Sequence, residues 1–229
     1  MNISNYRPIS VLNIFSKMIE KLVHKQLYEY LEVRNVLSDS QFGFRRNRST
    51  TQALLRHTNH LYESLDENKL AFPSYLDLRK AFDSVNQRVL LSKMMHYGIR
   101  GLPHSWFCSY LANRQQYVNV NNAISEMHVV SHSVPQGSNL GPLLFLIYIN
   151  DLSQVTDYFE CVMFADDCAL SCSFTRAEIP VIHHSINYNL EKVYKWLCAN
   201  RIMLNSDKTK YILYSYKEDI NLNHQNWSK

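Results

Sequence analysis

Apolar residues recur at the spacing of an amphipathic helix in several stretches of the chain. The first stretch is residues 11–31, with Ser10 available as its N-terminal cap. A second helix is predicted to follow the polar, basic loop at residues 41–50, because Ser49 or Thr50 can cap it. The same spacing predicts three more helices: one through Val89 and Met94 that ends at Gly98, one that starts near Leu140, and one at about 177–200.

Short apolar segments bounded by turn residues predict strands. One strand, at residues 74–78, carries Asp77 near its end. Two more, at 159–164 and 168–174, form a hairpin whose turn holds Ala165, Asp166 and Asp167. The carboxylates therefore stand at strand ends.

The remaining strands are predicted at 117–120 and 127–134, as a hairpin around Asn121 and Asn122, and at 211–214. Together these elements form a sheet backed by helices, which predicts the α+β class.

Pro73 precedes the strand of Asp77 and lacks a backbone donor. It therefore suits only a strand start or an edge and is expected to weaken pairing.

Composition and charge narrow the class of protein. The chain has 229 residues, of which 46% are hydrophobic and 19% charged, so it can build a globular core. A net charge of +4 permits a polyanionic partner without requiring one. The five cysteines form no C-x-x-C pair, which favours reduced thiols in an intracellular protein, nuclear or cytoplasmic. The longest apolar run, residues 140–149, is too short for a bilayer of about 30 Å, so no membrane partner is expected.

The strand-end acids suggest a chemistry. If neighbouring strands hold Asp77, Asp166 and Asp167 together, their like charges repel unless a hard cation lies between them. Mg²⁺ suits carboxylate oxygens and substrate phosphates, and two such ions can support phosphoryl transfer. Taken singly, each acid is as well explained as an ordinary turn or cap residue.

Six segments in order resemble the reverse transcriptases of non-LTR retrotransposons, and the chain looks closest to the jockey-like groups. The resemblance covers about residues 5–214. The segments are Asn5-Tyr6-Arg7-Pro8-Ile9-Ser10; Gln41-Phe42-Gly43-Phe44-Arg45 with Arg48-Ser49-Thr50-Thr51; Leu76-Asp77-Leu78-Arg79-Lys80-Ala81-Phe82-Asp83-Ser84-Val85; Val134-Pro135-Gln136-Gly137-Ser138 through Gly141-Pro142-Leu143-Leu144-Phe145; Phe164-Ala165-Asp166-Asp167; and Trp196-Leu197 with Leu204-Asn205 and Lys208-Thr209.

The resemblance implies roles for the acids. Asp77 and Asp166 would bind two Mg²⁺ ions, for which Mn²⁺ could substitute, while Asp167 supports the site and the Leu78 carbonyl offers another ligand. The implied reaction is RNA-directed DNA synthesis, in which a DNA primer is extended on an RNA template from deoxynucleoside triphosphates.

The resemblance also implies substrate contacts, each with a plainer alternative. Phe82 would pack under the incoming sugar and exclude a 2′-hydroxyl, or simply fill the core. Gln136 and Gly137 would lie beside the nucleotide and template, or form an ordinary turn. Arg45 would hold the triphosphate, or belong to a solvated basic loop. Lys208 would protonate the departing pyrophosphate, which needs a partly desolvated ammonium, or be a surface lysine.

The fold that the resemblance implies is a right-hand polymerase with a ferredoxin-like (RRM-like) palm sheet. Residues 1–68 would be a fingers-type helical region, residues 69–214 the palm with a fingers insertion, and residues 215–229 a polar tail in which no thumb is expected. The chain is thus interpreted as a truncated retrotransposon fragment. Two alternatives stay open: a group II intron or retron-like reverse transcriptase, and a catalytically idle remnant that acts as an RNA-binding or interaction module.

Overall fold

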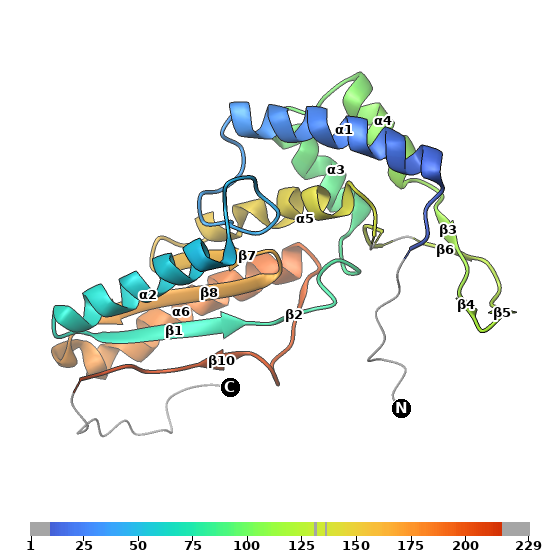
Figure 1. Cartoon of the computed structure of the whole chain (residues 1–229). Coiled ribbons are helices and arrows are strands. Elements are labelled where there is room, and N and C mark those ends of the chain that lie inside the picture. Colours follow the sequence, from blue (N-terminus) through green and yellow to red (C-terminus); the bar gives the residue numbers. More distant parts are fainter. Residues whose placement is uncertain (1–9, 131, 136, 217–229) are drawn as a thin grey trace. The chain divides into compact units, whose positions relative to one another are not determined.

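The computed structural model describes residues 10–130, 132–135 and 137–216 (Figure 1). The described residues do not include residues 1–9, where most of the first motif lies, or Gln136, or the tail from residue 217 onward. The chain divides into two compact units. We call Met1–Leu37 with Lys80–Tyr148 the helical unit, and Ser38–Arg79 with Ile149–Lys229 the sheet unit.

The sheet unit is built on a four-stranded antiparallel sheet with the strand order β10-β1-β8-β7. Figure 1 shows α2 on one face of this sheet and α6 on the other. The predicted mixture of helices and sheet is confirmed. The elements of the unit are α2 (Thr50–Asp66), β1 (Leu70–Leu76), β2 (Leu78–Arg79), β7 (Glu160–Phe164), β8 (Asp167–Phe174), α6 (Ile179–Ala199), β9 (Met203–Leu204) and β10 (Lys210–Tyr211), with 3-10 turns at Asn150–Gln154 and Arg176–Glu178.

The strand that leads to Asp77 is longer than predicted. β1 pairs with β8 over seven residues and contains Pro73 in its middle, so the prediction of weak pairing around this proline was wrong. The Pro73 carbonyl accepts from the Ile212 N–H at 3.0 Å, on the side of β10. In an extended strand the nitrogen of a residue points to the same side as its carbonyl. The missing donor therefore faces the short edge strand, and the ladder to β8 is not interrupted.

Local capping decides where the long helices begin. α2 starts after Ser49 as predicted, and Ser49 and Gln52 form a reciprocal capping box. α1 (Ile14–Val33) starts later than predicted, because the Asn13 side chain accepts from the Phe15 N–H and caps the helix in place of Ser10.

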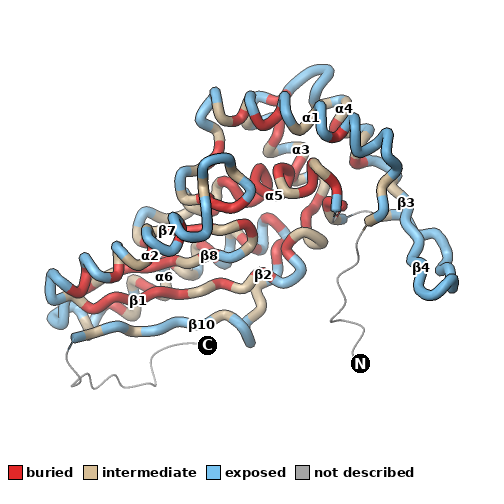
Figure 2. The backbone as a smooth tube through the Cα atoms, viewed as in Figure 1, coloured by how far each residue is buried: buried red, intermediate tan, exposed pale blue. Residues whose placement is uncertain are grey.

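The helical unit contains the other helices and a two-stranded ribbon. Figure 2 shows that α5 is buried along its length whereas the ribbon is exposed throughout. Among the residues described, no helix has both the length and the apolar character that crossing a membrane requires. The elements are α1, α3 (Gln87–His96), α4 (Leu102–Leu111), β3 (Gln115–Gln116), β4 (Asn119–Val120), β5 (Ala123–Ile124), β6 (His128–Val129) and α5 (Gly141–Ile149), whose last residue is counted with the sheet unit.

α4 was not predicted from the sequence. It begins after Gly101, which has a φ of +62°, and carries Pro103 in its first turn. Proline in the first turn is typical of a helix start, so this signal was present.

The hairpin around Asn121 and Asn122 was predicted, and the positive φ angles of both residues confirm its turn. Its strands differ from the prediction: Asn119–Val120 pairs with Ala123–Ile124, and β6 covers only His128–Val129 of the strand predicted at 127–134.

A buried carboxylate ties the helical unit together. Glu20 of α1 is only 2% exposed. Its two oxygens accept from the Tyr110 hydroxyl at 2.7 Å and from the Asn139 N–H at 2.8 Å. Burial, followed by the hydrogen bond to Glu20, raises the pKa of Tyr110, so Tyr110 is a stable donor. Because both carboxylate oxygens are satisfied, Glu20 can link α1, α4 and the loop before α5.

Candidate active site

The three predicted carboxylates lie at one end of the sheet. Leu76 opposes Cys168 in the β1–β8 ladder, so the next residue, Asp77, lies across from Asp167. Phe164 pairs with Asp167, which leaves only Ala165 and Asp166 in the β7–β8 turn. Asp167 is therefore the first residue of β8, and its predicted place within the turn was wrong, because the hairpin closes with two residues.

The negative charges of these carboxylates act on one another. Partial burial, then the negative charge of Asp166 and then that of Asp77, raise the pKa of the Asp167 carboxyl. A raised pKa means that the folded chain disfavours the ionised form of Asp167. The site therefore concentrates negative charge that a bound cation would stabilise.

Asp77 is held by the segment that follows β9. The Asn205 side-chain amide donates to the Asp77 carboxylate at 2.7 Å, and the Asp77 N–H donates to the Thr209 hydroxyl at 3.2 Å. The Asn205 N–H also donates to the Asp77 carbonyl at 2.8 Å. The sequence prediction gave neither residue a role, although both belong to the segment of Lys208 that marked the resemblance.

The Leu78 carbonyl takes no part in the hydrogen bonds between β2 and β9. Leu78 opposes Leu204 in that short antiparallel pair. The Asn205 N–H bonds to the Asp77 carbonyl, so Asp77 and Asn205 form a hydrogen-bonded pair. Hydrogen-bonded and non-hydrogen-bonded pairs alternate in an antiparallel ladder, so Leu78 and Leu204 form a non-hydrogen-bonded pair. The predicted ligand oxygen of Leu78 is therefore not used by β9.

The donor atoms of these groups are all oxygens on neighbouring strand ends, and oxygen is the ligand that a hard divalent cation prefers. Within the described ranges, however, no three His, Cys, Asp or Glu side chains are gathered closely enough to enclose an ion by themselves. Mg²⁺ is usually held by one or two carboxylates together with substrate phosphates, so a fully formed protein cage is not required.

Gln41 is a further residue that the sequence prediction left without a role. It is 1% exposed and lies against the turn that carries Asp166. Its side-chain oxygen accepts from the Ala165 N–H at 2.9 Å and from the Gly43 N–H at 2.8 Å, and its amide nitrogen donates to the Ala165 carbonyl at 3.3 Å. The available signal was its position within the Gln41-Phe42-Gly43 motif.

Four more of the predicted residues each lie within one of the two units. Arg45 donates to the Ser38 carbonyl at 2.8 Å, within its own loop. Lys208 lies exposed in the turn after β9, so it is not desolvated there. Phe82 belongs to the helical unit and stacks on Phe145, with ring centroids 4.5 Å apart. Gly137, in the same unit, has a φ of +99°, a conformation that favours glycine.

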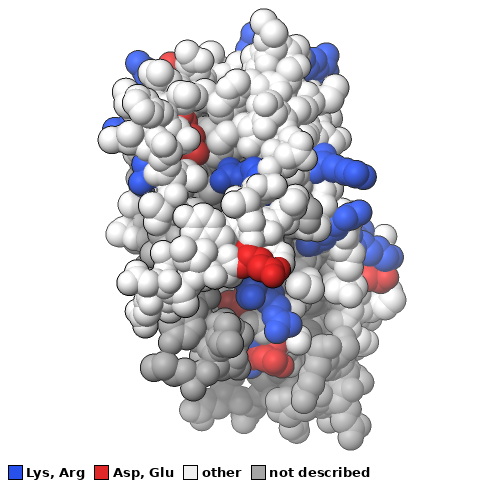
Figure 3. Space-filling model, turned by 90° about the vertical axis from the view of Figure 1, so that its right-hand side faces the viewer, with Lys and Arg blue, Asp and Glu red and all other residues white. Residues whose placement is uncertain are grey.

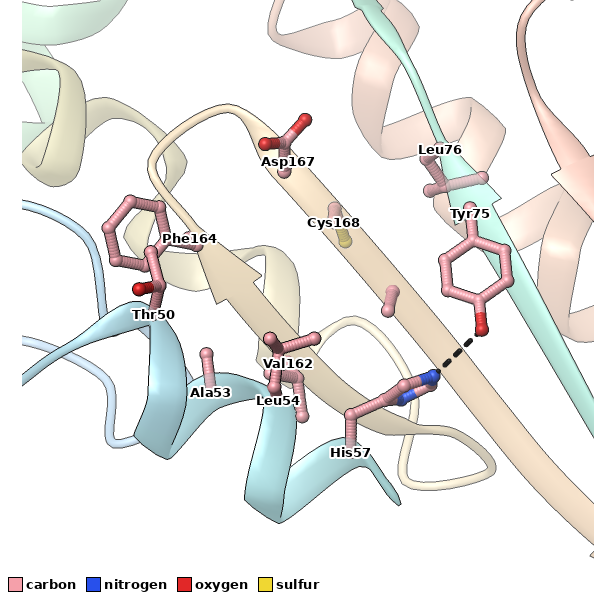
Figure 4. Close-up of a pocket in the computed structure, with 11 residues that line it drawn as sticks. Thr50, Ala53, Leu54, His57, Tyr75, Leu76, Val162, Phe164, Asp167 and Cys168 are labelled. Atoms are coloured by element: carbon pink, nitrogen blue, oxygen red, sulfur yellow. Dashed lines mark hydrogen bonds between the residues drawn. The ribbon is translucent and has the colours of Figure 1, made fainter. Parts of the chain in front are cut away.

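A mostly apolar pocket of about 370 Å³ lies between α2 and the sheet, beside the acids (Figure 4). Asp167 and Phe164 line it at one end, and His57 lines it from α2. The His57 Nε2 and the Tyr75 hydroxyl form a 3.0 Å hydrogen bond, drawn as the dashed line. The His57 Nδ1 is buried and has no hydrogen-bond partner among the described residues.

We expect His57 to make the stability of the chain depend on pH. Burial, and then the neighbouring His60, lower the pKa of His57, so the folded chain holds it neutral. Below the pKa of an unfolded histidine, about 6.5, the unfolded chain binds a proton that folded His57 resists. The free energy of unfolding should therefore rise with pH through the range just below 6.5.

Denaturant titrations at pH 5, 6 and 7 measure this dependence. His57→Gln should flatten the dependence on pH, whereas His128→Gln, at an exposed ribbon position, should leave it as in the wild type. An identical pH slope in the wild type and His57→Gln would contradict the prediction.

Comparison with known families identifies the chain. The family model described as reverse transcriptase (RNA-dependent DNA polymerase) matches residues 2–226. The chain belongs to the reverse transcriptase family. The predicted resemblance is thereby confirmed.

Curated relatives within the family include proteins from mobile elements of Drosophila melanogaster. The probable RNA-directed DNA polymerase from transposon BS is 35% identical over 72% of this chain. The corresponding protein from transposon X-element is 32% identical over 93%, and the RNA-directed DNA polymerase from mobile element jockey is 27% identical over 93%. The aligned region covers only 19% of the BS protein and 24% of each of the other two.

Solved structures with a similar fold include telomerases. Telomerase from Candida tropicalis, in complex with a fragment of telomeric RNA, matches 87% of this chain with a TM-score of 0.60 and 14% identity. Telomerase from Candida albicans, in a similar complex, matches 86% with a TM-score of 0.56 and 14% identity. The chain covers 34% of each of those structures. At this identity the likeness concerns the fold.

Proposed function

We propose that this chain is a polymerase core that extends a DNA primer on an RNA template by nucleotidyl transfer from deoxynucleoside triphosphates. The observation that carries the proposal is the placement of Asp77, Asp166 and Asp167 at adjoining strand ends, where partial burial and then the charges of Asp166 and Asp77 raise the pKa of Asp167. Membership of the reverse transcriptase family supports the choice of RNA as template and DNA as product.

The architecture that we propose is that of polymerase fingers and palm. Residues 1–68 are assigned to a fingers-type region, and residues 69–214 to the palm with a fingers insertion. The antiparallel sheet with the acids at one end supports the palm assignment. The similarity to telomerase structures supports it at the level of the fold.

In the proposed mechanism Asp77 and Asp166 would hold two Mg²⁺ ions, or Mn²⁺ in their place, with the Leu78 carbonyl as a further ligand. When bound, such ions would supply a lower pKa for the attacking hydroxyl and would neutralise charge on the phosphates. Asn205 fixes one oxygen of Asp77 and leaves its other oxygen for a ligand. Asp167 adds negative charge beside this pair and so favours the cation-bound state.

The proposed substrate contacts follow from the family resemblance. Arg45 offers guanidinium donors to the triphosphate, and Gln136 with Gly137 contacts the nucleotide and template. Lys208 acts as the proton donor to pyrophosphate, which requires substrate to desolvate its exposed ammonium. On the face shown in Figure 3, basic and acidic side chains both occur, so this face does not carry one broad positive field. We place this activity in the nucleus or cytoplasm.

If Phe82 excludes the 2′-hydroxyl, Phe82→Ala should raise the use of ribonucleotides relative to deoxynucleotides. Removing one clash is worth about 1–3 kcal/mol, or roughly 10- to 200-fold in the ratio of kcat/KM values. Single-nucleotide incorporation with matched dNTP and rNTP measures that ratio. Because Phe82 stacks on Phe145, Phe145→Leu controls for lost packing. A fall of equal size with both nucleotides would assign Phe82 to packing alone.

The test of the proposed function is primer extension by the purified chain on a homopolymer RNA template, with and without Mg²⁺. Incorporation of the complementary deoxynucleotide that requires both template and metal supports the proposal. A chain that binds the primer-template, measured by fluorescence anisotropy, but incorporates nothing would overturn it in favour of an RNA-binding remnant.

A further inference from the structure

The turn that carries Asp166 has an unfavourable backbone conformation. Ala165 has a φ of +57°, in the left-handed region that side chains other than glycine rarely adopt. In a two-residue hairpin of this kind, glycine is the usual residue at the first turn position. The orientation of the next residue, Asp166, therefore depends on what holds Ala165 in this conformation.

The amide of Gln41 holds Ala165 from both sides. Its oxygen accepts from the Ala165 N–H, and its nitrogen donates to the Ala165 carbonyl. A glutamine amide offers both a donor and an acceptor in one plane, which neither a carboxylate nor an apolar side chain can do. Gln41 is almost completely buried, so water does not readily replace these bonds.

The backbone around Gln41 is itself fixed to β7. The Phe42 N–H donates to the Met163 carbonyl, and the Met163 N–H donates to the Ser40 carbonyl, both at 2.8 Å. Gln41 and Met163 form a parallel bridge. The loop at residues 38–45 is thus attached to the hairpin by main-chain bonds, and the Gln41 side chain extends this attachment to the turn.

We propose that Gln41 is a positioning residue for the metal-binding carboxylates: through Ala165, its amide sets the direction in which Asp166 presents its oxygens. The inference rests on the proposed function, because it assigns Asp166 to metal binding. It adds to that function a residue that touches neither metal nor substrate.

Two substitutions distinguish the role of the hydrogen-bond donor of the Gln41 amide from the role of its acceptor. Gln41→Leu removes the donor and the acceptor, whereas Gln41→Glu keeps the acceptor and loses the donor. Binding of Mn²⁺ alone, followed by electron paramagnetic resonance, should weaken about tenfold in Gln41→Leu and less in Gln41→Glu. In primer extension kcat should fall about 10- to 100-fold in Gln41→Leu, the scale of a 1 Å misplacement, while KM for the nucleotide changes little.

Matched controls identify the cause. Gln115→Leu makes the same chemical change at an exposed ribbon position and should behave as the wild type. Hydrogen exchange at the Ala165 N–H should quicken in Gln41→Leu, which shows directly that the turn has been released. If Gln41→Leu does not fold, Gln41→Glu carries the test through the same measurements.

The outcomes distinguish the inference from the proposed function. A folded Gln41 variant that binds Mn²⁺ and extends primers as the wild type does would overturn the positioning role. A wild-type chain that binds Mn²⁺ but extends no primer would overturn the proposed function, and weaker Mn²⁺ binding by Gln41→Leu would still support positioning.

Discussion

Replacing Asp166 by asparagine should reduce primer extension about 10³-fold or more. Asparagine keeps the size of the side chain and one oxygen but removes the charge that attracts a divalent cation. Metal ions supply several kcal/mol of transition-state stabilisation in phosphoryl transfer, and about 4 kcal/mol corresponds to a factor of 10³ in rate. Asp77→Asn should cause a loss of similar size. The measurement is single-turnover incorporation on an RNA template at saturating Mg²⁺.

Asp166→Asn should be at least as stable as the wild type without metal. After partial burial, the charge of Asp166 is the next cause that raises the pKa of Asp167, and its removal relieves that repulsion. Asp157→Asn, at an exposed position, controls for the chemical change and should retain activity. An Asp166→Asn chain that folds and still extends primers at more than a tenth of the wild-type rate would refute the assignment of Asp166.

Gly43→Ala should destabilise the sheet unit by about 3 kcal/mol, at the upper end of what overpacking costs. A Cβ at Gly43 would lie 2.2 Å from the Ala165 nitrogen and 2.9 Å from its Cα, both of them backbone atoms. Backbone cannot rotate away as a flexible side chain can, so the loop and the turn must separate. Urea denaturation measures the loss of stability, and primer extension should fall with it because the turn carries Asp166.

A substitution at a second glycine is the control for backbone strain without a steric clash. Gly101 has a φ of +62°, and a Cβ added there meets no atom within 4 Å. Gly101→Ala should therefore cost only the penalty of its positive-φ backbone conformation, about 1–3 kcal/mol, and should leave the acids undisturbed. Equal stability of Gly43→Ala and the wild type would show that the contact between Gly43 and Ala165 is looser than the structure indicates.

Local sequence signals predicted the elements that depend on local interactions. Ser49 caps α2 because its hydroxyl reaches a backbone N–H three residues away. Asn121 and Asn122 specify the ribbon turn because asparagine tolerates positive φ. Pro73 misled the prediction, because its effect depends on which neighbouring strand its nitrogen faces. α4 was missed although Pro103 marked its start.

The sequence by itself predicted the three candidate acids and their approach to one end of the sheet, because order and spacing along the chain carry that information. It could not determine which distant side chains hold them. Asn205 lies 128 residues from Asp77, and Gln41 lies 124 residues from Ala165. Such contacts arise only when the strands pair and bring loops to one end of the sheet. Tertiary structure alone therefore decided how the predicted acids are supported, because hydrogen bonding depends on distance in space and not along the chain.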